Sequence, residues 1–487
     1  MEYINNYITV NSKINLSQLD PQIYKINKTD KTNNSINDNL KSSFIIYKKI
    51  FNSTSTQIYS RKINIPSHLK NIFEDFYKSF IDGLANDNYD FIKNLNSVKY
   101  VYEIYIKDLE MFKFYAYDND IDYVTKILHI FHIFTNYVFS SPHKKINFIK
   151  RLFRSTNFDT LGDNEINKYI FNIYIFPNDL KRTLAGTSYI PEHLNIYKKK
   201  NSAFTTSGVT SFNMLLTKKE ELCKLFLHEL IHLYKLDGTH THETDFLINI
   251  RNKMPFNDSN SERESVAELM SNIYNCMNLS LIISKDNKLS VEDEILLFNQ
   301  LINIEKEYSI MIVAKILKYF NVKPEELFNY TRTKVELVSP INLYYVVRSI
   351  IFDKLNNFLQ NNNFQDKKIL EINENIYSQV VDFIKNANRP DSIYMQKLLF
   401  YYNKMNIKNN LAVSYICLDI DFNKVKFNNI IVYELFDEQY LFENFKKQVM
   451  SKSFNQTGGN NNNYYYKKYL KYKIKYLNIM KNMKDSS

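Results

Sequence analysis

Several residue types are scarce in this chain of 487 residues: it has no tryptophan, 3 cysteines, 7 glycines and 9 prolines. The scarcity of glycine and proline argues against a turn-rich β fold and favours helices. The three cysteines, Cys223, Cys276 and Cys417, form neither a disulfide framework nor a cysteine-based zinc site, which is typical of a protein in a reducing compartment.

Two further absences concern targeting. No stretch of 18 apolar residues occurs, and the apolar residues 127–141 are interrupted by histidine and asparagine, so the sequence predicts no transmembrane helix. Residues 1–6 lack the charged start and the apolar core of a secretory signal peptide. We therefore expect an intracellular protein that is not secreted.

The composition is that of a globular protein, with 44% hydrophobic and 15% aromatic residues, and the length allows two or three domains. The formal net charge is +11. Residues 460–487 carry seven lysines and one aspartate, so they account for about half of that charge. Because the remainder is only mildly basic, the overall charge does not argue for a nucleic-acid partner.

The most specific pattern is His228-Glu229-Leu230-Ile231-His232, an H-E-x-x-H motif. On a helix, residues four apart share a face, so His228 and His232 could bind one Zn²⁺. Glu229 could then act as the general base for a zinc-activated water. The surrounding sequence predicts a helix that begins at a capping box, Thr217-x-x-Glu220, and ends at Asp237-Gly238.

This helix is apolar almost all round and is therefore expected to be buried. Its polar side chains form one stripe, which consists of Glu221, Lys224, His228, His232 and Lys235, with Glu229 further round. Histidines on a buried helix need a metal or polar partners. Two core histidines bonded to carbonyl groups are the alternative, which leaves Glu229 without a role.

A second predicted helix contains Ser261-Glu262-Arg263-Glu264-Ser265-Val266-Ala267-Glu268, in which Glu264, Ala267 and Glu268 share a face. Two carboxylates one turn apart suit a third metal ligand and an acceptor for the N–H of a ligand histidine. If Ser261 and Glu264 instead form a capping box, Glu268 would bind the metal, whereas a cap at Ser259 and Glu262 leaves Glu264 free. Further candidates lie in the polar stretch after the first helix: His240, His242 and Glu243.

The succession of H-E-x-x-H and E-x-x-A-E resembles the gluzincin class of zinc metalloproteinases, and E-S-V-A-E is similar to the third-ligand helix of the anthrax lethal factor family. The resemblance covers about residues 165–280. It implies a zincin-like core, Zn²⁺ held by His228, His232 and Glu264, Glu229 as general base and Glu268 in the outer shell. The implied activity is that of an endopeptidase acting on a protein or peptide substrate.

One departure concerns the tyrosine that this family places about two turns before its third ligand, to stabilise the oxyanion. That position here is Asn257, and its neighbours include no tyrosine. Gluzincins often take this donor from the domain after the zinc core. The candidates are Tyr344 and Tyr345, in the predicted helix that also contains Arg348.

The expected fold class is α+β and predominantly α-helical, with a small mixed sheet before the active-site helix. We divide the chain into an N-terminal arm or small subdomain (1–60), a helical region (61–160), the metal-binding core (161–285), a helical C-terminal domain (286–455) and a linker with tail (456–487). Strands are expected at 44–47, at 169–176, within 202–216, at 411–418 and at 430–433. Helices are expected at 72–84, 98–112, 121–139, 291–319 and 342–359.

The tail begins with Gly458-Gly459 and an asparagine run, which predict a flexible linker. The following Tyr/Lys-rich segment resembles C-terminal tails of giant DNA virus proteins, which implies a place in the virion or the host cytoplasm. Its Leu470, Ile474 and Leu477 share a helical face, so we expect it to order on an anionic partner, either nucleic acid or a lipid surface.

Two alternatives to the peptidase follow from these patterns. The chain could be a catalytically inactive zinc-binding structural or virion protein, an interpretation that the missing tyrosine near Asn257 favours and the intact Glu229 opposes. It could also be an adaptor that binds nucleic acid or a membrane surface through the basic tail. Salt-dependent binding that vanishes with the tail would mark the adaptor.

Overall fold

The structure is a computed structural model of the whole chain. It describes residues 2–21, 38–65, 99–107, 109, 111–139, 170–178, 193–195, 211–234, 236, 252, 254–255, 261–331, 341–361, 376–405 and 416–435. The described part is a mixed α+β fold that is mostly helical, as the sequence predicts.

The described strands form one mixed, seven-stranded sheet in the order β5-β6-β4-β3-β2-β1-β7. They are β1 (Thr56–Asn64), β2 (Tyr100–Ile106), β3 (Phe112–Ala116), β4 (Ile170–Asn178), β5 (His193–Asn195), β6 (Ser211–Lys218) and β7 (Ile430–Leu435). The pairs β1/β2, β2/β3 and β5/β6 are antiparallel, whereas β1/β7, β3/β4 and β4/β6 are parallel. Strands from four of the five predicted regions therefore share one sheet.

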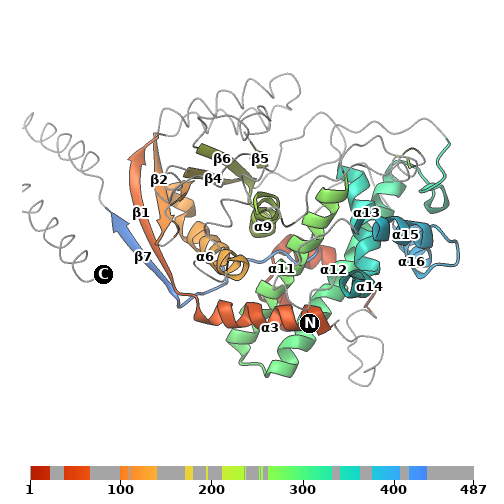
Figure 1. Cartoon of the computed structure of the whole chain (residues 1–487), viewed down its shortest axis with the longest axis horizontal. Coiled ribbons are helices and arrows are strands. Elements are labelled where there is room, and N and C mark those ends of the chain that lie inside the picture. Colours follow the sequence, from red (N-terminus) through yellow and green to blue (C-terminus); the bar gives the residue numbers. More distant parts are fainter. Residues whose placement is uncertain are drawn as a thin grey trace, which may run out of the picture.

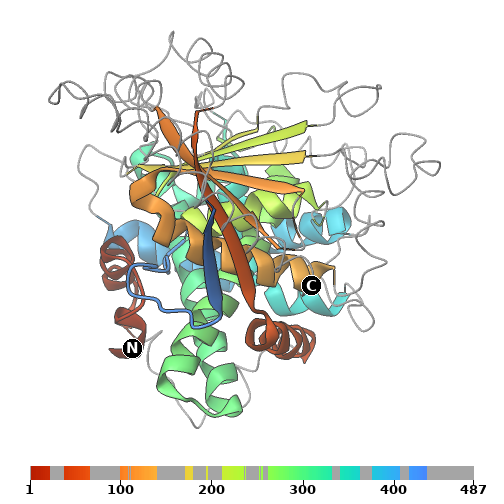
Figure 2. The ribbon, with the colours of Figure 1, turned by 90° about the vertical axis from the view of Figure 1, so that its left-hand side faces the viewer.

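An aromatic cluster joins the sheet to the helices on one of its faces. Phe112 and Phe114 of β3 make edge contacts with Phe131 of α6 (Ile121–Val138), with ring centroids 5.1 and 5.2 Å apart. Phe131 stacks on Phe226 of α9 (Leu222–Leu233), at 5.4 Å. These contacts fix α6 and α9 side by side between the sheet and the rest of the molecule (Figures 1 and 2).

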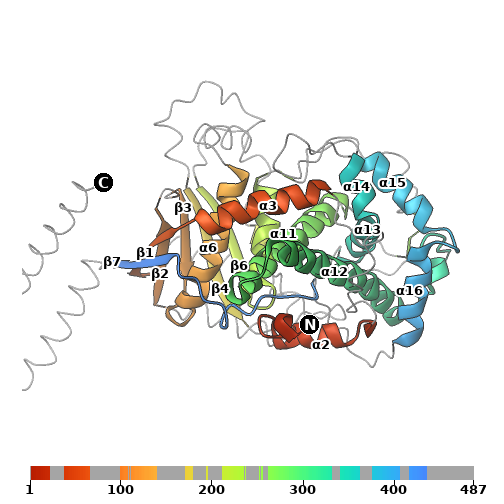
Figure 3. The same cartoon turned by 90° about the horizontal axis from the view of Figure 1, so that it is seen from below.

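Most of the other described helices pack on the side of α9 that faces away from the sheet, whereas α3 runs alongside α6 (Figures 1 and 3). The long helices are α11 (Ser261–Asn287) and α12 (Val291–Tyr319), and the others are α1 (Glu2–Asn5), α2 (Val10–Ser17), α3 (Asp38–Ser53), α13 (Ile341–Asp353), α14 (Leu355–Asn361), α15 (Ile376–Ala387) and α16 (Ile393–Lys404). Two 3₁₀ turns complete the set, Asp118–Asp120 and Pro324–Glu326. Helix α11 contacts α9 on one side and α12 and α13 on the other.

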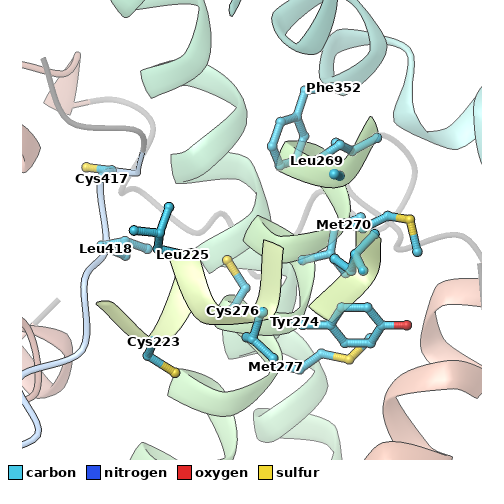
Figure 4. Packing of buried hydrophobic residues seen from close by; sticks show 14 of the residues in the cluster. Cys223, Leu225, Leu269, Met270, Tyr274, Cys276, Met277, Phe352, Cys417 and Leu418 are labelled. Atoms are coloured by element: carbon cyan, nitrogen blue, oxygen red, sulfur yellow. The ribbon is translucent and has the colours of Figure 1, made fainter. Parts of the chain in front are cut away.

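Small side chains line the contact between α9 and α11. Ala267 and Cys276 of α11 are fully buried, and Cys223 of α9 lies close to the same core (Figure 4). All three cysteines are free and buried. Burial raises the pKa of each thiol, which makes these cysteines small core residues and not nucleophiles.

A buried extended segment, residues 416–421, ties the C-terminal part of the chain to the N-terminus. Ile8 forms an isolated bridge with Ile420, and the N–H of Asp419 donates to Ser12 Oγ at 2.8 Å. The N–H groups of Cys417 and Leu418 donate to the two carboxylate oxygens of Glu305, at 3.0 and 2.7 Å. This segment, called the strap below, contacts α2, α9, α11 and α12.

Some predicted elements are confirmed and others are wrong. The helices at 121–139 and 291–319 and the strands at 169–176 and 430–433 are confirmed, and the helix at 342–359 is present but divided into α13 and α14. The described residues within 98–112 do not form a helix: they contain β2, whose Ile104 and Ile106 are buried in the core shared with the helices. Aliphatic residues at such short intervals fit the period of a helix as well as that of a strand. Here pairing in the sheet makes the segment a strand.

Two strand predictions are also wrong. Residues 44–47 lie in α3, where Leu40, Phe44, Tyr47 and Phe51 are buried at helical spacing. Residues 416–418, the described part of the predicted strand 411–418, are extended but outside the sheet, because carboxylates accept their N–H groups. The predicted helix at 72–84 lies outside the described residues. Among the helices that the structure describes, none has both the length and the apolar character needed to cross a membrane.

Candidate metal centre

Helix α9 begins later than the sequence predicts. Thr217 belongs to β6, so it cannot cap the helix, and the first helical residue is Leu222. Glu221 precedes it in the left-handed conformation, with φ 63°, which costs a non-glycine residue about 1 kcal/mol. The N–H of Glu221 donates to the Asp419 carboxylate at 3.0 Å, so the strap stabilises this strained start.

The polar stripe of α9 faces α11, and the two helices run in opposite directions at this contact. Lys224 contacts Glu268, His228 contacts both Glu268 and Glu264, and His232 contacts Glu264. Residues spaced by four on α9 thus oppose residues spaced by four on α11. Ala267, which lies between the two glutamates and is fully buried, keeps the helices close.

Three side-chain atoms converge at the centre of this contact. His228 Nε2 and His232 Nε2 are 3.0 Å apart, and Glu264 Oε2 lies 3.2 and 3.3 Å from them. A tetrahedral ion with bonds of about 2.0–2.2 Å separates its ligand atoms by roughly 3.3–3.6 Å. The three residues therefore form a cluster that could hold a metal ion, as the sequence predicts.

The cluster is deep on one side and accessible on the other. The His228 side chain is 3% exposed, whereas those of His232 and Glu264 are 15% and 35% exposed. A metal at this position would therefore lie against the buried imidazole of His228. Solvent or another molecule could approach it past Glu264.

Glu229 lies beside the same cluster. Its side chain is buried, and its Oε1 is 3.9 Å from Nε2 of His228. The carboxylate is thus close to the converging donors without being one of them. A group in this place can exchange a proton with a molecule held at the cluster.

Glu268 lies on the opposite side of His228. Its Oε1 is 3.1 Å from Nδ1 of His228, and its Oε2 contacts Nζ of Lys224 and, at 3.4 Å, Nη1 of Arg348 from α13. An ionised carboxylate only accepts hydrogen bonds, so this placement favours a proton on Nδ1 of His228, which leaves Nε2 with its lone pair. The predicted outer-shell role of Glu268 agrees with this arrangement.

The pKa values of the site residues follow from burial and from these contacts. Burial opposes the charge of Glu264, but the charge of His232 and the hydrogen bonds of both imidazoles hold the pKa of Glu264 well below its usual range. Burial likewise opposes ionisation of Glu268, and Lys224, His228 and Arg348 bring its pKa below the usual value. Burial lowers the pKa of Lys224. Both carboxylates are therefore anionic at neutral pH.

The predicted oxyanion donors are placed only in part. Tyr345 is fully buried, and its ring lies under the guanidinium of Arg348, 4.7 Å from the ring centroid. The side chain of Tyr344 is not among those that the structure describes. Asn257 and the alternative ligands at 240–243 also lie outside the described residues. The donor role of either tyrosine stays a prediction.

The site contains two charged residues that the ligand motifs do not include, although the sequence indicates them. Lys224 belongs to the predicted polar stripe, and Arg348 follows Val346 and Val347 in a helix that is buried at these positions. A charge in such a helix needs a partner of opposite sign. Both cations find the same partner, Glu268.

Comparison with known proteins gives one distant relative. The chain is 25% identical over 242 residues to an uncharacterized protein of Acanthamoeba polyphaga mimivirus, in a match that covers 46% of this chain and 56% of the relative. This similarity points to a giant-virus origin, in agreement with the composition of the tail. No family model and no solved structure matches the chain.

Proposed function

We propose that the protein is a zinc-dependent endopeptidase of the gluzincin type. The observation that carries this proposal is the convergence of His228 Nε2, His232 Nε2 and Glu264 Oε2 next to the buried carboxylate of Glu229. Two imidazoles and one carboxylate are a donor set of catalytic zinc sites, and their spacing suits bonds of about 2.0–2.2 Å.

The number of ligands favours a catalytic over a structural metal. Structural zinc sites are usually closed by four protein ligands, whereas catalytic sites use three and leave one position open. Among the residues that the structure describes, three donors converge, and the side of Glu264 is partly exposed. This argues against the alternative of an inactive zinc-binding scaffold.

In the proposed reaction, a bound zinc ion supplies Lewis-acid chemistry: it lowers the pKa of water and polarises a carbonyl group. Glu229 accepts a proton from the attacking water and then donates it to the nitrogen of the leaving amine. Its burial keeps competing water away from the carboxylate. His228 and His232 present their Nε2 atoms, and Glu268 holds the ring of His228 in place through Nδ1.

The substrate in this proposal is a protein or peptide, and the place of action is the virion or the cytoplasm of the host cell. The distant viral relative supports this place of action. The basic tail would address the enzyme to an anionic partner, either nucleic acid or a lipid surface.

The decisive experiment compares the purified full-length protein with Glu229→Gln. We expect the wild type to bind one Zn²⁺ and to cleave an unfolded protein, with activity lost on chelation and restored by Zn²⁺. Glu229→Gln should keep the metal and lose at least 10²-fold in activity, because an amide cannot act as a base.

Glu292→Gln, which removes an exposed carboxylate at the start of α12, is the matched control and should cleave as the wild type does. Cleavage by Glu229→Gln at the wild-type rate in the presence of Zn²⁺ would show that the proposed mechanism is wrong.

A further inference from the structure

A pair of buried cations lies behind the candidate metal centre, where the sequence motifs assign no role. Lys224 of α9 and Arg348 of α13 both contact Oε2 of Glu268, and both side chains are 0% exposed. We propose that these two cations are positioning residues, which fix Glu268 so that His228 presents Nε2 to the metal. This inference rests on the proposed function and extends it to the far side of the centre.

The argument begins with the two oxygens of the Glu268 carboxylate. Both cations lie on Oε2, and Oε1 is 3.1 Å from Nδ1 of His228. Because strong donors hold Oε2, the carboxylate cannot rotate without losing charge-assisted hydrogen bonds. Oε1 is therefore held where it can only accept from Nδ1, and the tautomer of His228 is set.

The cations are themselves held in place. Nε of Arg348 donates to Ser309 Oγ of α12 at 3.0 Å, and its guanidinium lies over the ring of Tyr345, 4.7 Å from the centroid. Lys224 stands one turn before His228 on the same face of α9. The carboxylate is thus clamped between the helix that carries the histidines and the two helices behind α11.

Two cations meet one oxygen of Glu268, and the buried carboxylates of Glu221 and Glu305 also interact with them. A lone carboxylate behind a ligand histidine raises the basicity of that ligand. The two cations hold Oε2 and so keep Oε1 at Nδ1, which preserves this effect and sets the direction of His228.

The test uses the full-length protein, and Zn²⁺ and Co²⁺ as the probes. Lys224→Met and Arg348→Met remove each charge while keeping a long side chain. We expect each to weaken Zn²⁺ binding by about 10–100-fold in competition with a chelator. The visible absorption of the Co²⁺-loaded variants should also differ from that of the wild type, because the geometry of the His228 ligand changes.

Two further variants separate positioning from a general effect on folding. Arg348→Lys keeps the charge and should recover part of the lost affinity. Lys397→Met removes a partly buried ion pair with Glu307, on α16 and α12, and should bind Zn²⁺ as the wild type does. Where a methionine variant does not fold, Lys224→Gln or Arg348→Gln, which keep a donor without the charge, replaces it with the same expected loss.

The outcomes distinguish this inference from the proposed function. A wild-type protein that binds Zn²⁺ and cleaves peptides, with neutral variants that bind Zn²⁺ within twofold of it and give the same Co²⁺ spectrum, overturns the positioning role alone. A wild-type protein that binds no Zn²⁺ overturns both. Weaker Zn²⁺ binding in the neutral variants, with partial recovery in Arg348→Lys, supports the inference.

Discussion

At the scale of single residues, acidic and basic side chains follow one another from the accessible side of the site to its buried side. Glu264 lies on the accessible side of His228 and His232, and Glu268 lies on the buried side between His228 and the two cations. The two glutamates are one turn apart on α11, yet only Glu264 faces both Nε2 atoms. This difference in direction assigns them different roles.

The assignment predicts a ranking of zinc affinities. Glu264→Ala should abolish stoichiometric Zn²⁺ binding, because it removes one of three ligands. Glu268→Gln should retain Zn²⁺ but bind it about 10–100-fold more weakly, as expected for an outer-shell change. We choose glutamine at 268 because alanine would leave Lys224 and Arg348 buried without their common acceptor, at a cost of about 3–5 kcal/mol.

Metal content after dialysis and competition with a chelator measure both affinities. The reverse ranking would make Glu268 the ligand, as the alternative capping box at Ser261 implies. A metal retained by the Glu264→Ala protein through residues 240–243 would also contradict the assignment.

The sequence was sufficient to predict the cluster that could hold a metal ion, because spacing of four on a helix is a local property. His228, His232, Glu264 and Glu268 meet as expected once α9 and α11 are formed. It was not sufficient to predict which charge neutralises Glu268. Arg348 is 80 residues away in the chain, and only the packing of α13 against α11 brings them together.

At the scale of elements, the predictions from the sequence fail where a contact with a residue far along the chain replaces a local contact. Thr217-x-x-Glu220 has the pattern of a capping box, but Thr217 pairs within the sheet, and the start of α9 is instead fixed by Asp419. Residues 416–418 have the composition of a strand, but carboxylates accept the N–H groups of Cys417 and Leu418. A pattern read locally cannot show such partners.

The contact between the strap and α12 predicts a pH dependence of stability. Burial raises the pKa of Glu305 from 4.5 to about 7, although the N–H groups of Cys417 and Leu418 favour its charge. Between these values the folded protein holds a proton that the unfolded chain has released. The contribution of Glu305 to stability is therefore present below about pH 4.5 and is lost as the pH rises to about 7.

Urea unfolding of the wild type and of Glu305→Gln, at several values between pH 4.5 and pH 8, measures this contribution. The stability of the wild type relative to Glu305→Gln should fall with rising pH, by on the order of 1–3 kcal/mol in total, and level off above pH 7. A difference that is independent of pH, or that grows as the pH rises, would show that Glu305 is charged in the folded protein throughout this range.

At the scale of the whole molecule, the sheet unites segments that the sequence divides among separate regions. β1 ends at Asn64 and β7 begins at Ile430, yet the two strands are neighbours. The region from 61 to 160 supplies β2 and β3 as well as α6, so among its described residues the predicted α-helix is found only at Ile121–Val138. Pairing between distant strands leaves no periodic signal in the sequence.

The last prediction concerns the basic tail, which lies outside the described residues. The described elements end with β7 at Leu435, and the candidate centre draws its side chains from residues 224–348. Composition predicts a linker at 456–463, followed by a lysine-rich segment with one apolar helical face. Such a helix is marginal on its own in water, so the tail should serve binding and not the core.

Truncation after Thr457 tests this division. We expect the melting temperature and the Zn²⁺ content to be those of the full-length chain, because the described sheet and centre are built from residues that precede the cut. Salt-sensitive binding to anionic vesicles or to nucleic acid should be lost, since the removed segment carries about half of the net charge of +11. If the truncated protein instead unfolds or loses its metal, the tail belongs to the folded core, and its separation from the candidate metal centre is wrong.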